Sequence, residues 1–167
     1  GKEAMTTTIM HTSLPAEDTE KTAQVLPEIM NVEAVRFPPG GPKAWKVFSG
    51  DGTVNLEVVQ RGDLVAFAEN EGGWKTTPNP QRTSECHMAL CVDRPEAEVI
   101  EIAQRAGWTA RHCERGGGIF GLAEIWVDNA FMIEVLDPVQ SARYRENVTL
   151  AKWKQYLPMM LARTASA

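Results

Sequence analysis

The chain has 167 residues, 43% of them hydrophobic and 23% charged, which is the size and composition of one globular domain with a full core. Its net charge of −5 and pI near 5.3 argue against a nucleic-acid partner, which normally selects a basic surface. No apolar run reaches the roughly 18 residues of a membrane span, and residues 1–8 lack the basic start and apolar stretch of a signal peptide. The three cysteines cannot all pair, so we expect a cytoplasmic protein that keeps them reduced as small core residues. They are Cys86, Cys91 and Cys113.

The first regular segment is a short predicted strand that carries His11. A capping residue, Asp18 or Thr19, follows this strand and predicts a helix over residues 20–30. Asn31 ends the predicted helix, because asparagine readily adopts the left-handed conformation of a helix stop.

Strands complete this first unit. A strand-like run at residues 44–48 precedes the turn dipeptide Asp51-Gly52, and an apolar strand that carries Glu57 follows the turn. A connector rich in glycine and proline then occupies residues 60–84, with one possible short strand at 64–68 and loop elsewhere. Connectors of this length often cover a site or contact a partner.

The same order of signals then returns. A short predicted strand carries His87, Asp93 and Pro95 mark a helix start, the helix covers residues 96–106, and Gly107 stops it. The first helix and its stop lie at the same offsets from His11, which makes chance similarity between the two segments improbable.

The second unit also ends as the first does. A strand-like run at residues 122–127, the turn dipeptide Asp128-Asn129 and an apolar strand with Glu134 repeat the earlier pattern. Beyond it, residues 149–163 have the pattern of an amphipathic helix, which we expect to pack over one edge of a sheet.

The repeat predicts an α+β fold of two βαβββ modules. In the first module 46 residues separate His11 from Glu57, and in the second 47 separate His87 from Glu134. The expected boundaries are 8–62 for the first module, 63–84 for the connector, 85–138 for the second module and 139–167 for a C-terminal helical extension.

These four residues have the chemistry of a metal site. Side chains alternate between the two faces of a strand, so each Glu shares a face with apolar neighbours, where a carboxylate needs nearby positive charge. Neutral imidazole and carboxylate oxygens together suit zinc, iron, nickel, cobalt or manganese. We therefore predict one divalent metal ion held by His11, Glu57, His87 and Glu134. The alternative is a repeat that keeps the fold and uses its pocket without a metal.

The sequence resembles the vicinal oxygen chelate superfamily of glyoxalases, bleomycin-resistance proteins and extradiol dioxygenases. The resemblance covers roughly residues 8–138 and rests on the two His-bearing first strands and on the two Glu-bearing segments. These segments are Asn55-Leu56-Glu57-Val58-Val59 and Met132-Ile133-Glu134-Val135-Leu136.

The resemblance implies an open, cup-shaped mixed sheet with the metal on its concave face, to which this chain adds a C-terminal helix. The lactoylglutathione lyase and methylmalonyl-CoA epimerase branch takes a ligand from the first and fourth strand of each module. Carried onto this sequence, these positions are His11, Glu57, His87 and Glu134.

The function implied is that of a glyoxalase-like lyase or isomerase acting on a small carbonyl-containing metabolite. It would work through a metal-stabilised enediolate, with Glu57 or Glu134 as the catalytic base. One alternative is a metal-free drug- or metabolite-binding protein like the bleomycin-resistance members. Another is a ring-cleaving dioxygenase, in which Glu57 would stay uncoordinated. A homodimer is expected, and the sequence leaves open whether modules pair within one chain or between two.

Overall fold

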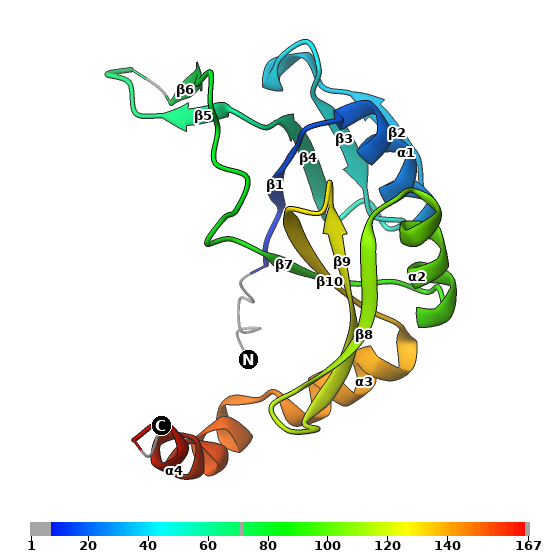
Figure 1. Cartoon of the computed structure of the whole chain (residues 1–167), viewed down its shortest axis with the longest axis vertical. Helices are drawn as coiled ribbons and strands as arrows, with labels where there is room; N and C mark the ends of the chain where they lie inside the picture. Colours follow the sequence, from blue (N-terminus) through cyan, green and yellow to red (C-terminus); the bar gives the residue numbers. More distant parts are fainter. Residues whose placement is uncertain (1–7, 71, 166–167) are drawn as a thin grey trace, which may run out of the picture.

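The computed structural model describes residues 8–70 and 72–165, and the first half of the chain forms one βαβββ module (Figure 1). Its elements are β1 (His11–Ala16), α1 (Thr19–Met30), β2 (Ala34–Arg36), β3 (Trp45–Phe48) and β4 (Asn55–Gln60). The sheet has the order β1-β4-β3-β2, in which β1 runs parallel to β4 and the other pairs are antiparallel. Residues 1–7, which include most of the segment tested for a signal peptide, lie outside this description.

The second half repeats this topology. Its elements are β7 (Met88–Cys91), α2 (Glu96–Arg105), β8 (Thr109–Arg115), β9 (Phe120–Val127) and β10 (Phe131–Leu136). The sheet order β7-β10-β9-β8 again has one parallel pair at one edge and antiparallel pairs after it. The predicted α+β fold of two βαβββ modules is therefore confirmed.

Local signals position these elements largely as expected. The side chain of Asp18 accepts a hydrogen bond from the Lys21 amide and caps α1, while Asn31 ends it at a φ of 54°. Gly107 follows α2 at a φ of 82°. The prediction that Asp93 caps α2 is wrong, because Pro95 occupies the N-cap position and contributes no side-chain hydrogen bond.

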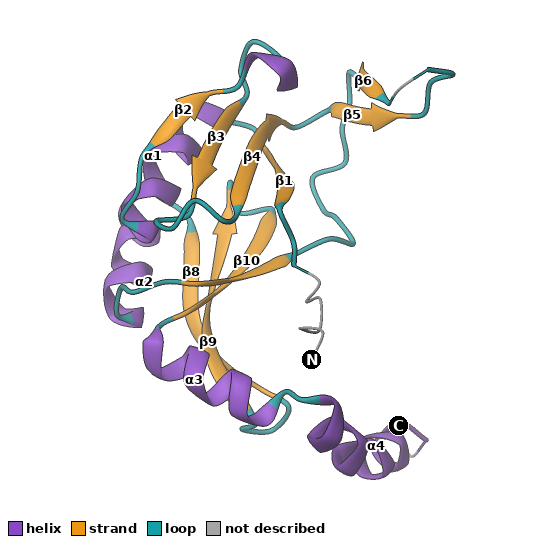
Figure 2. Ribbon diagram, turned by 180° about the vertical axis from the view of Figure 1, so that it is seen from behind, coloured by secondary structure: helices purple, strands orange, loops and turns teal. Residues whose placement is uncertain are grey.

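One face of each sheet is covered by helices. α1 packs on β3 and β4, and α2 packs on β8 and β9, so that both helices lie on the same side of the molecule (Figure 2). The opposite face of the two sheets, called the open face below, carries no helix of either module. The largest fully buried core side chains include Leu14, Leu26, Ile29, Val47, Leu56, Val99, Ile125 and Ile133.

The cysteines do not join this core. Cys86 and Cys91 are exposed and Cys113 is half-buried, so the expectation of three core cysteines is wrong. Cys113 alternates along β8 with His112 and lies on the side of that strand which carries Arg111 and Arg115. Position on the strand, rather than the apolar character of the thiol, decides its exposure.

The connector contains more regular structure than its sequence suggested. β5 (Asp63–Ala66) corresponds to the expected short strand, but β6 (Gly73–Thr76) was expected to be loop. These strands pair only with each other, antiparallel, and form a hairpin that projects from the body (Figure 1). Arg61 connects the two ends of the connector. Its buried guanidinium donates hydrogen bonds to the Gln81 and Arg82 carbonyls at 3.3 and 2.9 Å.

Two helices follow the second module. α3 (Pro138–Asn147), which was not predicted, packs on β9 and β10 and begins with a capping box between Asp137 and Gln140. α4 (Leu150–Ala165) matches the predicted amphipathic helix, but none of its residues is buried. The expectation that it packs over a sheet edge is therefore wrong. In the part of the chain that the structure describes, no helix is long and apolar enough to span a membrane.

Candidate metal centre

The first predicted ligand pair lies on adjacent strands. β1 and β4 pair in parallel with Ser13 opposite Glu57, and alternation along β1 places His11 on the same face as Ser13. The His11 Nε2 atom is 3.9 Å from Glu57 Oε1. Glu57 is buried, whereas the His11 side chain is exposed over more than half of its surface.

Glu57 has two further polar neighbours. The Ser13 hydroxyl donates a hydrogen bond to Glu57 Oε2 at 3.2 Å, and Lys46 Nζ lies 3.8 Å from Glu57 Oε1. Lys46 occupies the position of β3 that pairs in register with Glu57, and its ammonium also lies over the ring of Phe37 at 4.5 Å. The carboxylate therefore already has a cation beside it.

The second predicted pair is closer. His87 precedes β7 directly, and its Nε2 atom is 3.0 Å from Glu134 Oε1. The other carboxylate oxygen of Glu134 accepts a hydrogen bond from Arg115 Nε at 3.3 Å. Glu134 thus has both of its oxygens in contact with nitrogen atoms, one on the candidate ligand and one on a guanidinium.

A third carboxylate lies beside the second pair. Glu124 of β9 pairs in register with Glu134 and is buried. Burial alone raises the pKa of Glu124, but hydrogen bonds from Arg115, Arg111 and Trp126 outweigh it and lower the pKa to about 2. The hydrogen bond to Glu124 in turn raises the pKa of Arg115. At neutral pH these groups form a charged network next to Glu134.

Lys46, Arg115 and Glu124 were not predicted from the sequence. Each buried carboxylate was expected to need an external cation, but Lys46 and Arg115 supply positive charge from within the chain. Lys46 and Glu124 occupy equivalent positions of the two sheets, because each is paired in register with the candidate glutamate of the next strand, Glu57 or Glu134. Recognising this equivalence requires the strand register, which the sequence alone does not fix.

The structure brings the four predicted ligands together in two pairs. Among residues 8–70 and 72–165, no group of three or more His, Cys, Asp or Glu side chains is arranged to hold a metal ion. Each pair offers one imidazole nitrogen and one carboxylate, the donor chemistry that zinc, iron, nickel, cobalt and manganese accept. Each module of a single chain therefore presents one His–Glu pair.

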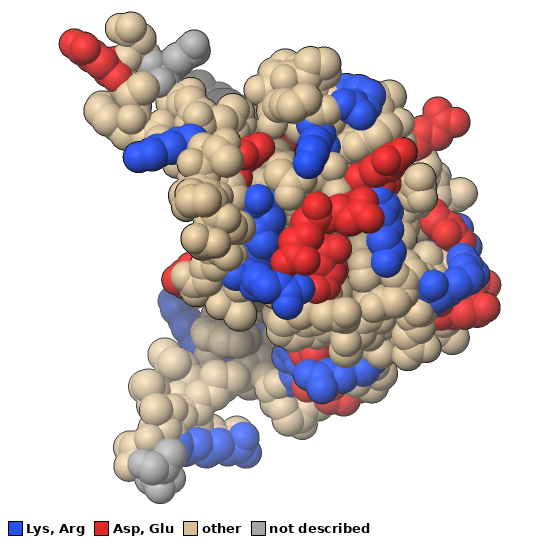
Figure 3. All heavy atoms as spheres, turned by 45° about the horizontal axis from the view of Figure 1, so that its top comes forward, with Lys and Arg blue, Asp and Glu red and all other residues tan. Residues whose placement is uncertain are grey.

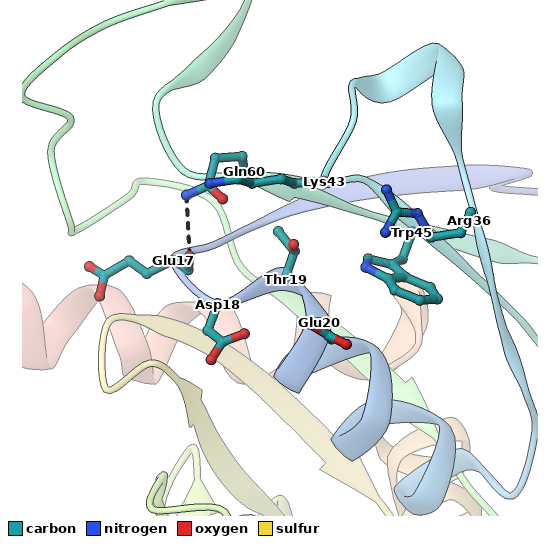
Figure 4. Close-up of a pocket in the computed structure, with 8 residues that line it drawn as sticks. All are labelled: Glu17, Asp18, Thr19, Glu20, Arg36, Lys43, Trp45 and Gln60. Atoms are coloured by element: carbon teal, nitrogen blue, oxygen red, sulfur yellow. Dashed lines mark hydrogen bonds between the residues drawn. The ribbon is translucent and has the colours of Figure 1, made fainter.

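Two surface cavities lie away from the two His–Glu pairs. A cavity of about 360 Å³ is located where β1 runs into α1, between Asp18, Thr19 and Trp45 (Figure 4). Within it the Gln60 amide donates a hydrogen bond to the Glu17 carbonyl at 3.2 Å. None of the four predicted ligands lines this cavity. On the face of the molecule that Figure 3 shows, Lys and Arg side chains lie close to Asp and Glu side chains.

Comparison with known proteins gives a match at the level of structure. No protein-family model matches the chain. No curated protein matches its sequence. FosX from Listeria monocytogenes, a genomically encoded fosfomycin resistance protein, is 17% identical and has a TM-score of 0.55, over 85% of this chain and 99% of the FosX chain.

Two further solved structures are similar. A mutant of the Listeria monocytogenes FosX, complexed with Mn(II) and 1S,2S-dihydroxypropylphosphonic acid, is 15% identical with a TM-score of 0.55, over 85% of this chain and 98% of that one. FosX from Mesorhizobium loti is 16% identical with a TM-score of 0.50, over 83% and 98% of the two chains. The chain therefore has the fold of the vicinal oxygen chelate superfamily, as its sequence suggested. At these identities the likeness concerns the fold.

Proposed function

We propose that this protein is a metal-dependent enzyme of the vicinal oxygen chelate type that acts on a small carbonyl-containing metabolite. The observation that carries the proposal is the equivalence of the two pairs. His11 with Glu57, and His87 with Glu134, face each other at matching strand positions of two modules that share one topology. The Mn(II) bound by the structurally similar FosX mutant supports a divalent ion as the occupant.

The complete centre in this proposal lies between two copies of the chain. One chain brings its described donors together only in pairs, and both pairs lie on the open face. A second copy across that face would add His87 and Glu134 to the His11 and Glu57 of the first. A homodimer then contains two identical centres, one for each chain.

Within such a centre the ion supplies Lewis-acid polarisation of a substrate oxygen. Glu57 is the better candidate for the base that removes a proton from the carbon next to the carbonyl. Its contacts to His11 and Lys46 are long, at 3.9 and 3.8 Å, and only Ser13 donates a hydrogen bond to it. Glu134 is held more tightly, by His87 at 3.0 Å and by Arg115, and suits a fixed ligand.

The same contacts support the proposal of an acidic substrate. A divalent ion beside Glu57 and Glu134 would take over the neutralisation of these carboxylates, which Lys46 and Arg115 provide in the chain alone. Both cations would then be available to a carboxylate or phosphonate of the substrate. The phosphonic acid bound by the FosX mutant is a ligand of this class, although it belongs to that protein.

Elemental analysis tests the metal first. Protein purified without chelator should contain about one divalent ion per chain, and His11→Ala and His87→Ala should each lose most of it, because each removes one of four ligands. His112→Ala is the matched control, since His112 contacts Glu96 and Glu114 rather than either pair. Metal retained in both ligand variants, or lost equally in the control, contradicts the proposed centre.

Turnover separates the roles of the two glutamates. Glu57→Gln should lower kcat by at least about a hundredfold while keeping most of the metal, because it removes the base and retains an oxygen donor. Glu134→Gln should lower the metal content more than Glu57→Gln does. The opposite ranking of metal loss would exchange the two assignments.

A metal-free binding protein is the second candidate, and one observation favours it. Lys46 and Arg115 already neutralise the two carboxylates, so the open faces are stable without an ion. This reading predicts no bound metal after dialysis against zinc, manganese, nickel, cobalt or iron, together with tight binding of an acidic small molecule that Lys46→Met weakens.

A further inference from the structure

Two segments leave the body of the protein on the same side. The hairpin arm, residues 63–76, contains β5 and β6, and the helix arm is α4. They leave opposite ends of the molecule, and the open face lies between them (Figures 1 and 2). The protein therefore has the outline of a bracket with one arm at each end.

The hairpin arm presents an apolar surface. Val65 and Trp74 form a cross-strand pair on one face, and their exposed fractions are 71% and 39%. Phe67, directly after β5, is 97% exposed. An isolated two-stranded hairpin is marginally stable in water, so this element gains from a contact that its own chain does not provide.

The helix arm has a matching apolar stripe. Leu150, Trp153, Leu157 and Leu161 recur at helical spacing along α4, and each of them is exposed. Met159 lies on the other side of the helix, since it is two positions from Leu157 and Leu161. A lone helix of this length is likewise marginal in water, and its stripe faces no core.

The charges of the two arms are complementary. The sequence of α4 contains Lys152, Lys154 and Arg163 and no acidic residue. The described residues of the hairpin arm include two acidic residues, Asp63 and Glu69, and one basic residue, Lys75. Figure 3 shows acidic atoms near the end of the hairpin arm and basic atoms on the helix arm. Each arm therefore suits the other in both polarity and sign of charge.

The two arms of one chain lie at opposite ends and do not meet. A twofold axis in front of the open face would turn a second copy end over end and bring its helix arm to the hairpin arm of the first. The second pair of arms would meet in the same way, because a twofold interface repeats each contact.

We infer that the two arms join two copies of this chain, with α4 of each copy packed against the β5–β6 hairpin of the other. The arms then complete a dimer across the open faces. This is the same dimer as in the proposed function, and the inference rests on the proposed function for the position of the twofold axis. The arm contact itself requires no metal.

Sedimentation analysis of the purified, metal-depleted protein tests the contact. The wild-type chain should be a dimer, and Leu157→Asp should raise the dimer dissociation constant at least about tenfold, because it places a charge in the buried stripe twice per dimer. Phe67→Asp should act in the same direction. Met159→Asp is the matched control on the far side of α4 and should leave the dissociation constant unchanged. Circular dichroism verifies that each variant remains folded.

A photo-reactive benzoylphenylalanine at position 67 identifies the neighbour directly. Irradiation should give a product of twice the chain mass, joined to residues 150–165 of the other copy. A monomeric wild-type protein, a Leu157→Asp dimer as tight as wild type, or a cross-link outside α4 overturns the arm contact. If the arms cross-link but the protein never binds metal, the proposed function is contradicted and the arm contact is not. If the protein binds metal but its dimers do not depend on the arms, the arm contact is contradicted and the proposed function is not.

Discussion

At the scale of single residues, Glu124 combines burial with three hydrogen-bond donors, Arg111, Arg115 and Trp126. Its pKa of about 2 lies below the ordinary 4.5, because the donors outweigh the cost of burial. The network therefore contributes stability that is fully present above pH 4.5 and is lost as the pH falls toward 2.

Glu124→Gln should remove this dependence. Between about pH 5 and pH 2 the wild-type protein should lose up to about 3 kcal/mol of unfolding free energy that the variant does not lose. Urea unfolding of the metal-free protein at several pH values measures the difference. At neutral pH the variant should be the less stable protein, since Arg111 and Arg115 lose their counter-ion. Parallel pH profiles for the two proteins would contradict the network.

The contribution of His112 to the unfolding free energy should change with pH in the opposite direction. Its hydrogen bond with Glu96 at 2.7 Å, followed by the weaker contact with Glu114, raises its pKa above the ordinary 6.5. The contribution of protonated His112 is complete below pH 6.5 and disappears as the pH rises through the raised value. NMR titration should show a raised His112 pKa that Glu96→Gln returns toward 6.5. A His112 signal that titrates at the same pH in both proteins would exclude this cause.

The same scale shows what the sequence could reveal of the site. His11, Glu57, His87 and Glu134 were predicted as ligands because the spacing between His and Glu recurs in two matched frames, and the structure places the His and Glu of each pair 3.9 and 3.0 Å apart. Lys46, Arg115 and Glu124 were not found, because their contacts depend on register across neighbouring strands. That register follows from tertiary pairing and not from any local pattern.

At the scale of elements, α3 offers a direct test of local structure. The Asp137 side chain accepts from the Gln140 amide at 2.8 Å, and the Gln140 side chain accepts from the Asp137 amide at 3.0 Å. Asp137→Ala should lower the unfolding free energy by about 1 kcal/mol, while Asp137→Asn should keep most of it, because asparagine caps equally well. Chemical denaturation compares them, and equal losses in both variants would show that the cap is not the cause.

Helices and strands whose ends are marked by capping or turn residues were predictable from the sequence, and elements without such residues were not. Asp18 and Asn31 marked both ends of α1. β6 was missed because its sequence begins with Gly73 and has no run of β-branched residues. For α4 the stripe that contains Leu157 showed that one face needs a partner, but a periodic pattern does not say which surface covers it.

At the scale of the whole molecule, each chain carries one His–Glu pair on each of two equivalent modules, and two arms that project on the same side. The repeat predicted the modules correctly, whereas a sequence pattern within one chain does not specify how the modules of two chains would combine. The central claim is that one metal centre takes His11 and Glu57 from one copy and His87 and Glu134 from another.

Mixing two defective variants measures this claim most directly. His11→Ala and His87→Ala should each bind little metal alone, but a mixed dimer has one centre with both substitutions and one with none. After co-refolding in equal amounts and isolation of the mixed dimer by two affinity tags, elemental analysis should find about one ion per dimer. A mixed dimer that binds no more metal than either variant alone would contradict a centre shared between two copies.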